Sequence, residues 1–206
     1  MTIENPRVKI DMAGDRLLVG AGGTLEIQSG AKVLDSRGDA IKGFIPLALA
    51  DAREVSANAT INAAGNGGLL ASDTTPIFQR VNGATDKALR LNWAATNVDE
   101  ITWSFAYPPD LDDTQPLEVH FLAAMAGAVD TPTLTVGYFE GVGDTDAGGA
   151  TAAVTGTTVA EYSRSIVGSD VSTPPQVASV SLIPGAHGTD ALFVYAAWIE
   201  YARKIS

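Results

Sequence analysis

Two stretches near the middle of the chain alternate large apolar residues with small or polar ones. One covers residues 101–107 and the other residues 117–125, with aromatic side chains at Trp103, Phe105 and Phe121. Only a β-strand turns a period of two into one buried face. Residues 108–116, between them, hold three prolines and three aspartates and cannot continue a strand ladder. The pattern predicts two long strands joined by an exposed acidic loop, forming half of a β-sandwich core.

Further strand patterns follow on both sides of this pair. Residues 76–81 and 88–93 flank an Asn-Gly sequence, which indicates a hairpin, and strands are also predicted at 132–140, 159–167, 177–184 and 191–201. No helical crossover pattern separates them. The predicted fold is therefore all-β: an antiparallel jelly-roll-like β-sandwich preceded by an extended glycine-rich N-terminal β arm. We predict residues 1–45 as the arm, with short glycine-punctuated strands, and residues 46–206 as the sandwich body.

The last predicted strand is apolar on both of its alternating sets. A regular alternation places Phe193, Tyr195, Ile199 and Tyr201 on one face, and Leu192, Val194 and Trp198 on the other. A strand that is apolar on both faces has to be covered twice. The opposite sheet provides one cover, and a neighbouring subunit or the N-terminal arm provides the other.

The N-terminal region repeats a short apolar strand followed by a glycine turn, at Gly23, Gly30 and Gly38. The spacing is similar to the rungs of a β-solenoid or triple β-spiral, which needs stacked partners to bury its core. Ordering a residue costs roughly 1–2 kcal/mol, and this segment has little apolar bulk to offset that cost. The alternative is an ordinary meander folded back on the body. The predicted subunit or partner contacts are Leu18, Leu25, Ile27, Val33, Ile41 and Trp198.

The charge of the chain is unevenly distributed. Its net charge is −11, yet residues 1–42 hold six basic and six acidic residues, so the entire excess lies on residues 43–206. An acidic body repels phosphate backbones, which argues against direct nucleic-acid binding. The chain has no cysteine, and we find no secretory leader and no apolar run long enough to span a membrane. We therefore expect a soluble protein made in the cytoplasm.

Catalytic and metal-binding patterns are weak. His120 and His187 are the only candidate bases of a serine triad, and no G-x-S-x-G sequence accompanies them. Gly20–Gly23 lacks the lysine of a phosphate loop. Asp144 and Asp146, or Asp110, Asp112 and Asp113, suggest calcium, but solvated loops are the simpler interpretation. We expect no catalytic residue, metal or cofactor, and a core containing the strand aromatics Trp103, Phe105, Tyr107, Phe121, Tyr138, Phe193 and Tyr195.

Four segments together resemble small virion proteins of tailed bacteriophages, most of all head decoration (cement) proteins. They are residues 19–31, 66–71, 88–93 and 193–201. The resemblance implies a structural, non-enzymatic homotrimer that binds the major capsid protein on the outside of the phage head. It also implies assembly in the host bacterial cytoplasm, no membrane association, and an arm that reaches onto the shell or a neighbour.

Three other functions remain open. The same arm suits the end of a trimeric shaft, which would make the body a tail-fibre or receptor-binding tip. A β-sandwich of this size also suits a carbohydrate-binding module. A glycan-cleaving enzyme is the third alternative, although paired catalytic carboxylates cannot be located from sequence alone.

Overall fold

The computed structural model describes residues 8–11, 16–19, 41–56, 60–61, 76–81, 87–141, 144–172 and 176–204. The glycine pattern at residues 23–38, and with it Leu25, Ile27 and Val33, lies outside the described residues. The helices in the described ranges are two short 3-10 turns, and no helix there has the length and apolar character needed to cross a bilayer.

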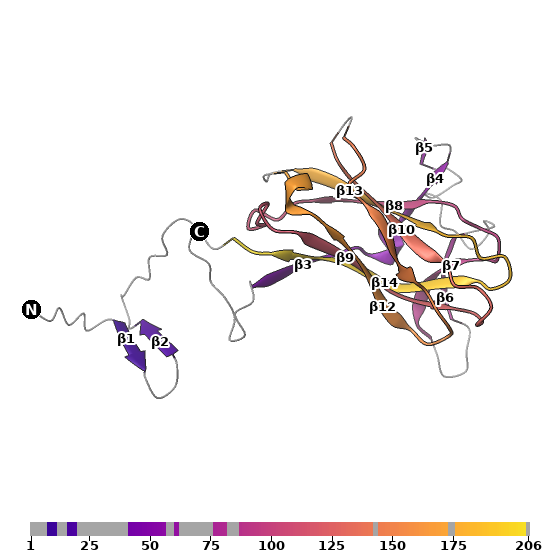
Figure 1. The fold of residues 1–206 in the computed structure, drawn as a ribbon, viewed down its shortest axis with the longest axis horizontal. Coiled ribbons are helices and arrows are strands. Elements are labelled where there is room, and N and C mark those ends of the chain that lie inside the picture. Colours follow the sequence, from indigo (N-terminus) through magenta and orange to yellow (C-terminus); the bar gives the residue numbers. More distant parts are fainter. Residues whose placement is uncertain are drawn as a thin grey trace, which may run out of the picture.

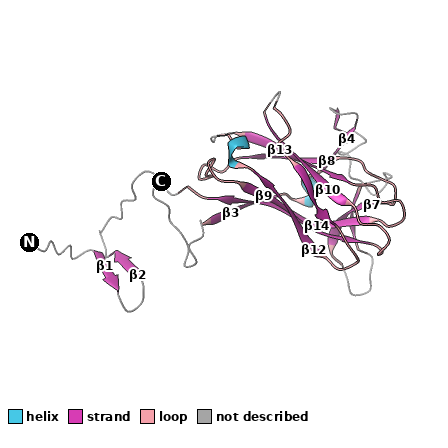
Figure 2. Ribbon diagram, in the orientation of Figure 1, coloured by secondary structure: helices cyan, strands magenta, loops and turns pink. Residues whose placement is uncertain are grey.

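Two antiparallel sheets face each other (Figure 1, Figure 2), which confirms the prediction of a jelly-roll-like β-sandwich. The first sheet has the strand order β11-β10-β13-β8-β4-β5, and the second has the order β12-β9-β14-β7-β6, with β3 also paired to β14. The strands are β1 (Val8–Asp11), β2 (Arg16–Val19), β3 (Lys42–Pro46), β4 (Arg53–Ser56), β5 (Thr60–Ile61), β6 (Ile77–Arg80), β7 (Leu89–Trp93), β8 (Ile101–Ala106), β9 (Leu117–Met125), β10 (Thr133–Glu140), β11 (Gly149–Ala153), β12 (Ala160–Ile166), β13 (Val177–Pro184) and β14 (Leu192–Ala202). The 3-10 turns are η1 (Leu49–Asp51) and η2 (Gly168–Asp170).

The strands predicted at residues 101–107 and 117–125 lie in opposite sheets. β8 belongs to the first sheet and β9 to the second, so their apolar sets face each other across the core. The rings of Trp103 and Phe121 meet there with centroids 6.5 Å apart. Trp93 and Tyr138 are also fully buried in this core. The predicted hairpin at residues 76–93 is also present, as the antiparallel pair β6 and β7.

A β-bulge in β14 overturns the predicted division of its faces. Val194 pairs with Ala123 and Ala196 pairs with the adjacent Leu122, so Tyr195 is an extra residue on β14. An extra residue shifts the alternation of side chains by one. The core side of β14 therefore holds Leu192, Val194, Ala197, Ile199 and Tyr201, while Phe193, Tyr195, Trp198 and Glu200 lie on the outer side.

β3 joins the second sheet by pairing with the last part of β14. Gly43 lies opposite Tyr201, and the Tyr201 ring packs so closely that a β-carbon on Gly43 would lie 2.2 Å from Cζ. Ile45 is buried in the core, whereas Phe44 is 61% exposed. This strand spans the predicted boundary between arm and body at residue 45. That division of the chain stays a prediction.

Two aspartates fasten the loop after β9 to the loop before β14. The Asp130 carboxylate accepts hydrogen bonds from the backbone N–H groups of Thr189 (2.6 Å) and Asp190 (2.7 Å). Asp190 accepts in return from the backbone N–H groups of Val129 (2.8 Å) and Asp130 (3.2 Å). The hydrogen bonds from Asp190 and then Thr189 lower the pKa of Asp130 below its usual 3.8.

Gly43→Ala tests the attachment of β3. The added methyl group collides with the Tyr201 ring, so we expect a loss of about 1–3 kcal/mol in the free energy of unfolding, typical of overpacking. Urea denaturation measures it. Gly188→Ala is the control, because a β-carbon there meets no atom within 4 Å. Equal stability of the two variants would show that β3 is not packed as described.

Asp130→Asn tests the loop fastening through its pH dependence. A carboxyl whose pKa is lowered by folding stabilises the native state above its unfolded pKa, and this contribution disappears as pH falls through the folded pKa. We expect the variant to melt a few degrees below the parent at pH 7, with the difference shrinking below pH 3.8. Thermal melts from pH 7 to pH 2.5 measure it, and a difference that is independent of pH would contradict the assignment.

Candidate functional site

The outer face of the second sheet collects the aromatic and charged side chains that the core does not use. We define it by the outward residues of its strands. They include Lys42 and Phe44 (β3), Ile77 and Gln79 (β6), Arg90 and Asn92 (β7), Glu118, His120, Leu122 and Ala124 (β9), Glu161, Ser163 and Ser165 (β12), and Phe193, Tyr195, Trp198 and Glu200 (β14).

One half of this face is an aromatic row along β14. The Phe193 and Tyr195 rings lie edge to face with centroids 6.4 Å apart. The Arg90 guanidinium lies 3.6 Å from the Phe193 ring centroid, and its Nη1 donates to the Tyr195 hydroxyl at 3.4 Å. With its amide oxygen turned toward Arg90, Gln79 accepts from the same guanidinium at 3.1 Å. These contacts fix the orientation of the row, since a cation over a ring face is attractive.

The other half places His120 among carboxylates. Its ring stacks flat on Trp198, with centroids 5.0 Å apart and an interplanar angle of 0°. His120 Nδ1 lies 2.7 Å from Glu161 Oε1, and Nε2 lies 3.5 Å from Glu118 Oε2. Lys42 forms an ion pair with Glu200 at 2.8 Å. The ligand atoms of Glu118, His120 and Glu200 lie within 4.8 Å of one another, so these three residues are close enough to hold a metal ion together.

The predicted contact residues are distributed as follows. Trp198 lies half-buried on the outer face, next to His120. Ile41 precedes β3, and its carbonyl accepts from the Arg203 N–H at 2.9 Å. Leu18 lies in β2, opposite Lys9 of β1. Leu25, Ile27 and Val33 lie outside the described residues, so the structure does not bring the six together or separate them.

The prediction that every strand aromatic is in the core is wrong for two of them. Phe193 and Tyr195 face outward, because the bulge at Tyr195 separates them from Ile199 and Tyr201. Trp103, Tyr107, Phe121 and Tyr138 are buried as predicted, and Phe105 is partly buried and packs against the core. The sequence carried one signal for the outward row, the two-sided apolar pattern of residues 191–201.

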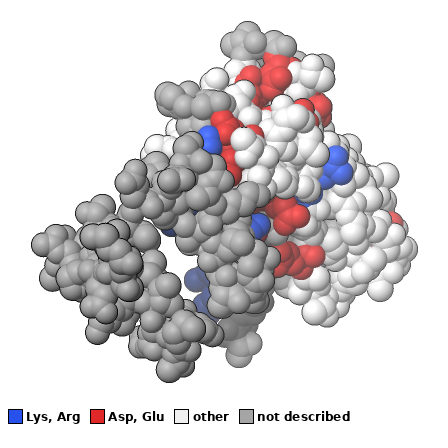
Figure 3. Space-filling model, turned by 60° about the vertical axis from the view of Figure 1, so that its left-hand side comes forward, with Lys and Arg blue, Asp and Glu red and all other residues white. Residues whose placement is uncertain are grey.

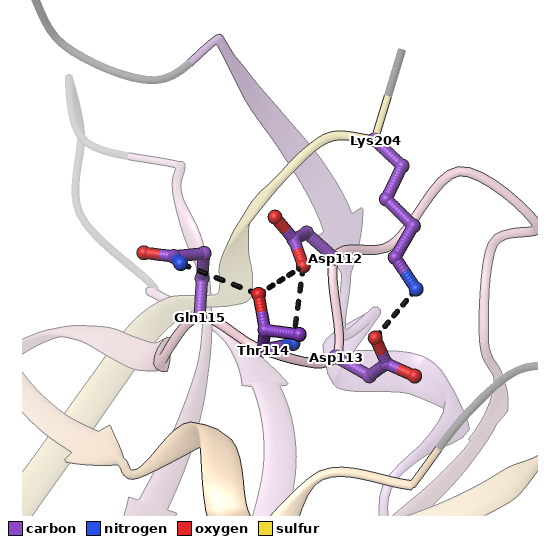
Figure 4. A network of polar contacts seen from close by, with 5 residues as sticks. All are labelled: Asp112, Asp113, Thr114, Gln115 and Lys204. Carbon is purple, nitrogen blue, oxygen red and sulfur yellow. Dashed lines mark hydrogen bonds and ion pairs between the residues drawn. The ribbon is translucent and has the colours of Figure 1, made fainter. Parts of the chain in front are cut away.

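The acidic loop between β8 and β9 anchors the chain near its C-terminal end. Asp110 accepts from Arg203 Nε at 2.5 Å, which lowers the pKa of the carboxyl, and Asp113 pairs with Lys204. Asp112 instead accepts from the backbone and hydroxyl of Thr114 (Figure 4). The three carboxylates of the calcium hypothesis thus have separate protein partners.

The second acidic loop lies between β10 and β11, beside a hollow of about 240 Å³ lined by Glu140, Asp144, Asp146, Ser169, Asp170 and Ser172. Asp146 accepts from the backbone N–H groups of Tyr138 and Gly148, and Asp144 from that of Glu140. Burial and then the Asp144 charge raise the pKa of Tyr107, which hydrogen-bonds to Glu140. These carboxylates order the loop backbone, and the hollow is strongly acidic.

The second histidine of the chain lies in a loop at the other end of the sandwich. His187 is buried, and its Nδ1 lies 2.8 Å from the Gly185 carbonyl oxygen. In the described part of the chain, the hydrogen bonds of His120 and His187 go to a carboxylate and a backbone carbonyl, and neither reaches a serine hydroxyl. The described geometry therefore gives no support for a serine triad.

No family model matches this sequence, and no curated protein does. Solved structures do. One is the CBM36-1 domain of a multidomain xylanase from the hindgut metagenome of Trinervitermes trinervoides, with 9% identity over 80% of this chain and 100% of that chain and a TM-score of 0.43. A family 30 carbohydrate-binding module of a Clostridium thermocellum cellulosomal cellulase is similar at 14% identity, covering 77% and 96% of the two chains, with a TM-score of 0.40.

A phage protein is also among the similar structures. It is the enzymatically active domain of tailspike protein 4 of bacteriophage CBA120, with 8% identity over 58% of this chain and 16% of that chain and a TM-score of 0.33. At such low identities and TM-scores, these likenesses extend to the sandwich fold alone.

Proposed function

We propose that this protein is a non-catalytic glycan-binding β-sandwich whose ligand lies on the outer face of the second sheet. The three outward aromatic side chains of β14 are the observation that carries the proposal: Phe193 and Tyr195 in the aromatic row, and Trp198 beside His120. Sugar rings present flat C–H surfaces that pack on aromatic rings, and their hydroxyls need hydrogen-bonding groups beside those rings. An aromatic surface surrounded by polar groups suits a ligand that has both apolar C–H faces and polar hydroxyls.

The polar groups of the face indicate the class of glycan. Asn92, Arg90 and Gln79 border the aromatic row on one side, and Glu118, Glu161 and Glu200 lie beyond Trp198 on the other. Carboxylates accept hydrogen bonds from sugar hydroxyls but repel anionic sugars. The body as a whole is acidic, and Figure 3 shows acidic side chains gathered over several parts of its surface. We therefore propose a neutral polysaccharide.

Trp198→Ala tests the glycan proposal. We expect the full chain to bind at least one neutral polysaccharide in affinity electrophoresis or on a glycan array. The variant should bind about tenfold more weakly, which corresponds to ~1.4 kcal/mol. Phe139→Ala is the matched control, a half-buried aromatic on β10 of the first sheet. Binding to no glycan, or an equal loss in both variants, would contradict the proposal.

A second measurement on the same polysaccharide separates binding from cleavage. Incubating the bound polysaccharide with the protein should release no new reducing ends. Release that disappears in Glu118→Gln or Glu200→Gln would replace the proposal with that of a glycan-cleaving enzyme.

Capsid decoration is a second candidate function, favoured by the N-terminal hairpin. In the described residues, β1 and β2 pair only with each other, and Figure 1 shows the hairpin away from the two sheets. A strand pair of this length is marginal in water without something to pack on. This proposal has the arm binding the major capsid protein on the outside of a phage head and joining three copies of the chain. A tail-fibre tip would use the arm in the same way.

Removing residues 1–40 tests the role of the arm while leaving β3 in place. Light scattering should show a trimer for the full chain and a monomer for the truncated one, with the β-sheet circular dichroism of the body retained. Leu25→Asp, a single charge in the predicted apolar line, should weaken the trimer as well. A monomeric full chain, or a trimer that survives the truncation, would contradict this role, and electron microscopy of phage particles would separate head from fibre.

A further inference from the structure

Three potential metal ligands converge on the outer face where β9 and β14 pair. Glu118 and His120 are two residues apart on β9, so their side chains share one face. Glu200 on β14 lies directly opposite Glu118 in the strand register. One carboxylate oxygen from each glutamate and one imidazole nitrogen lie within 4.8 Å of one another. The sheet itself creates this arrangement, since neighbouring positions on paired strands are held at fixed spacing.

His120 presents an unused nitrogen to the two glutamates. The residue is 6% exposed, and its Nδ1 lies 2.7 Å from Glu161 Oε1. Histidines that bind a metal through Nε2 commonly donate the other ring N–H to a carboxylate, which is the position that Glu161 occupies. Nε2 is buried and has no hydrogen-bond partner, and Glu118 Oε2, 3.5 Å away, is outside hydrogen-bonding geometry. Leaving a buried polar atom without a partner costs free energy. A group that binds Nε2 would therefore stabilise this arrangement.

Glu118 and Glu200 also bring two carboxylates close together. Carboxylates directly opposite each other on paired strands repel. Lys42 forms a 2.8 Å ion pair with Glu200, whereas Glu118 lies 3.5 Å from the His120 imidazole. A cation bound between Glu118, Glu200 and His120 Nε2 would reduce the repulsion between the two carboxylates. It would also give Nε2 the partner that it lacks. The Glu118 side chain is 44% exposed, which leaves a path for an ion to enter.

We propose that Glu118, His120 and Glu200 form a binding site for a divalent transition-metal ion of the Zn²⁺ type. One imidazole nitrogen and two carboxylates suit such an ion, whereas Ca²⁺ and Mg²⁺ prefer oxygen ligands alone. Glu161 orients the histidine from behind, in the way that carboxylates support metal-bound histidines. Three protein ligands leave a coordination position for water or for an oxygen of a bound molecule. The site goes beyond the proposed glycan binding, because it requires no glycan.

Calorimetric titration of the full, untagged chain with ZnCl₂, without glycan, tests the site. We expect one ion per chain, and Glu118→Gln and Glu200→Gln should each weaken binding by about tenfold or more. Glu161→Gln should weaken it by about 10–100-fold through the lost orientation of His120. Glu100→Gln is the matched control, a carboxylate outside the cluster whose loss should change nothing. Thermal melts of each variant without metal verify that it is folded.

The ring nitrogens of the two histidines provide the second readout. In ¹⁵N-detected NMR, zinc should move the His120 Nε2 resonance and leave that of His187 in place. No saturable binding by the parent chain would overturn the proposal. The proposal also fails if the Glu118→Gln, Glu200→Gln double variant binds zinc like the parent, or if the His187 resonance moves instead. A negative glycan screen would leave this titration unaffected.

Discussion

Pairing along both edges of β14 is the constraint on which the second sheet depends. β9 occupies one edge for most of the strand, while β7 and then β3 share the other. With both edges paired and the inner side in the core, the side chains of β14 reach solvent only through the outer face of the sheet. The single extra residue at Tyr195 decides which side chains those are. Without it, Trp198 would lie in the core and Ile199 would face outward.

Strand periodicity was sufficient to predict most of the sandwich. The alternation in β8 and β9 corresponds to strands in the structure. So do the two patterns that flank the Asn-Gly sequence, as β6 and β7, and the predicted strands at residues 159–167 and 177–184, as β12 and β13. The alternation of apolar and polar residues can be read from a few consecutive positions, because one face of a half-buried strand packs in the core and the other meets solvent. The sheet to which each strand belongs depends on pairing between distant segments, and the sequence shows no trace of it.

The outer face could not be predicted for the same reason. His120 lies in the strand predicted at residues 117–125, but Glu200 reaches it only because β9 and β14 pair in one particular register. The bulge is equally invisible, since Tyr195 and Ala196 have no glycine or proline to mark it. A regular alternation therefore placed Phe193 and Tyr195 in the core.

The acidic residues of the sandwich have different structural roles. Asp113 pairs with a lysine, Asp146 and Asp130 accept backbone N–H groups, and Glu118 faces another carboxylate. The net charge of −11 says nothing about this division. Carboxylates with a cation or several N–H donors stabilise the loops that carry them.

The hydrogen bond between the Arg203 N–H and the Ile41 carbonyl has a consequence for how the domain is mounted. It joins the start of β3 to the end of β14, so the polypeptide enters and leaves the sandwich side by side at one pole (Figure 1). Anything attached before residue 41 or after residue 204 emerges from that pole, and the loops at the opposite pole point away from it. A reporter inserted directly before residue 41 or directly after residue 204 would therefore sit at the same end of the sandwich.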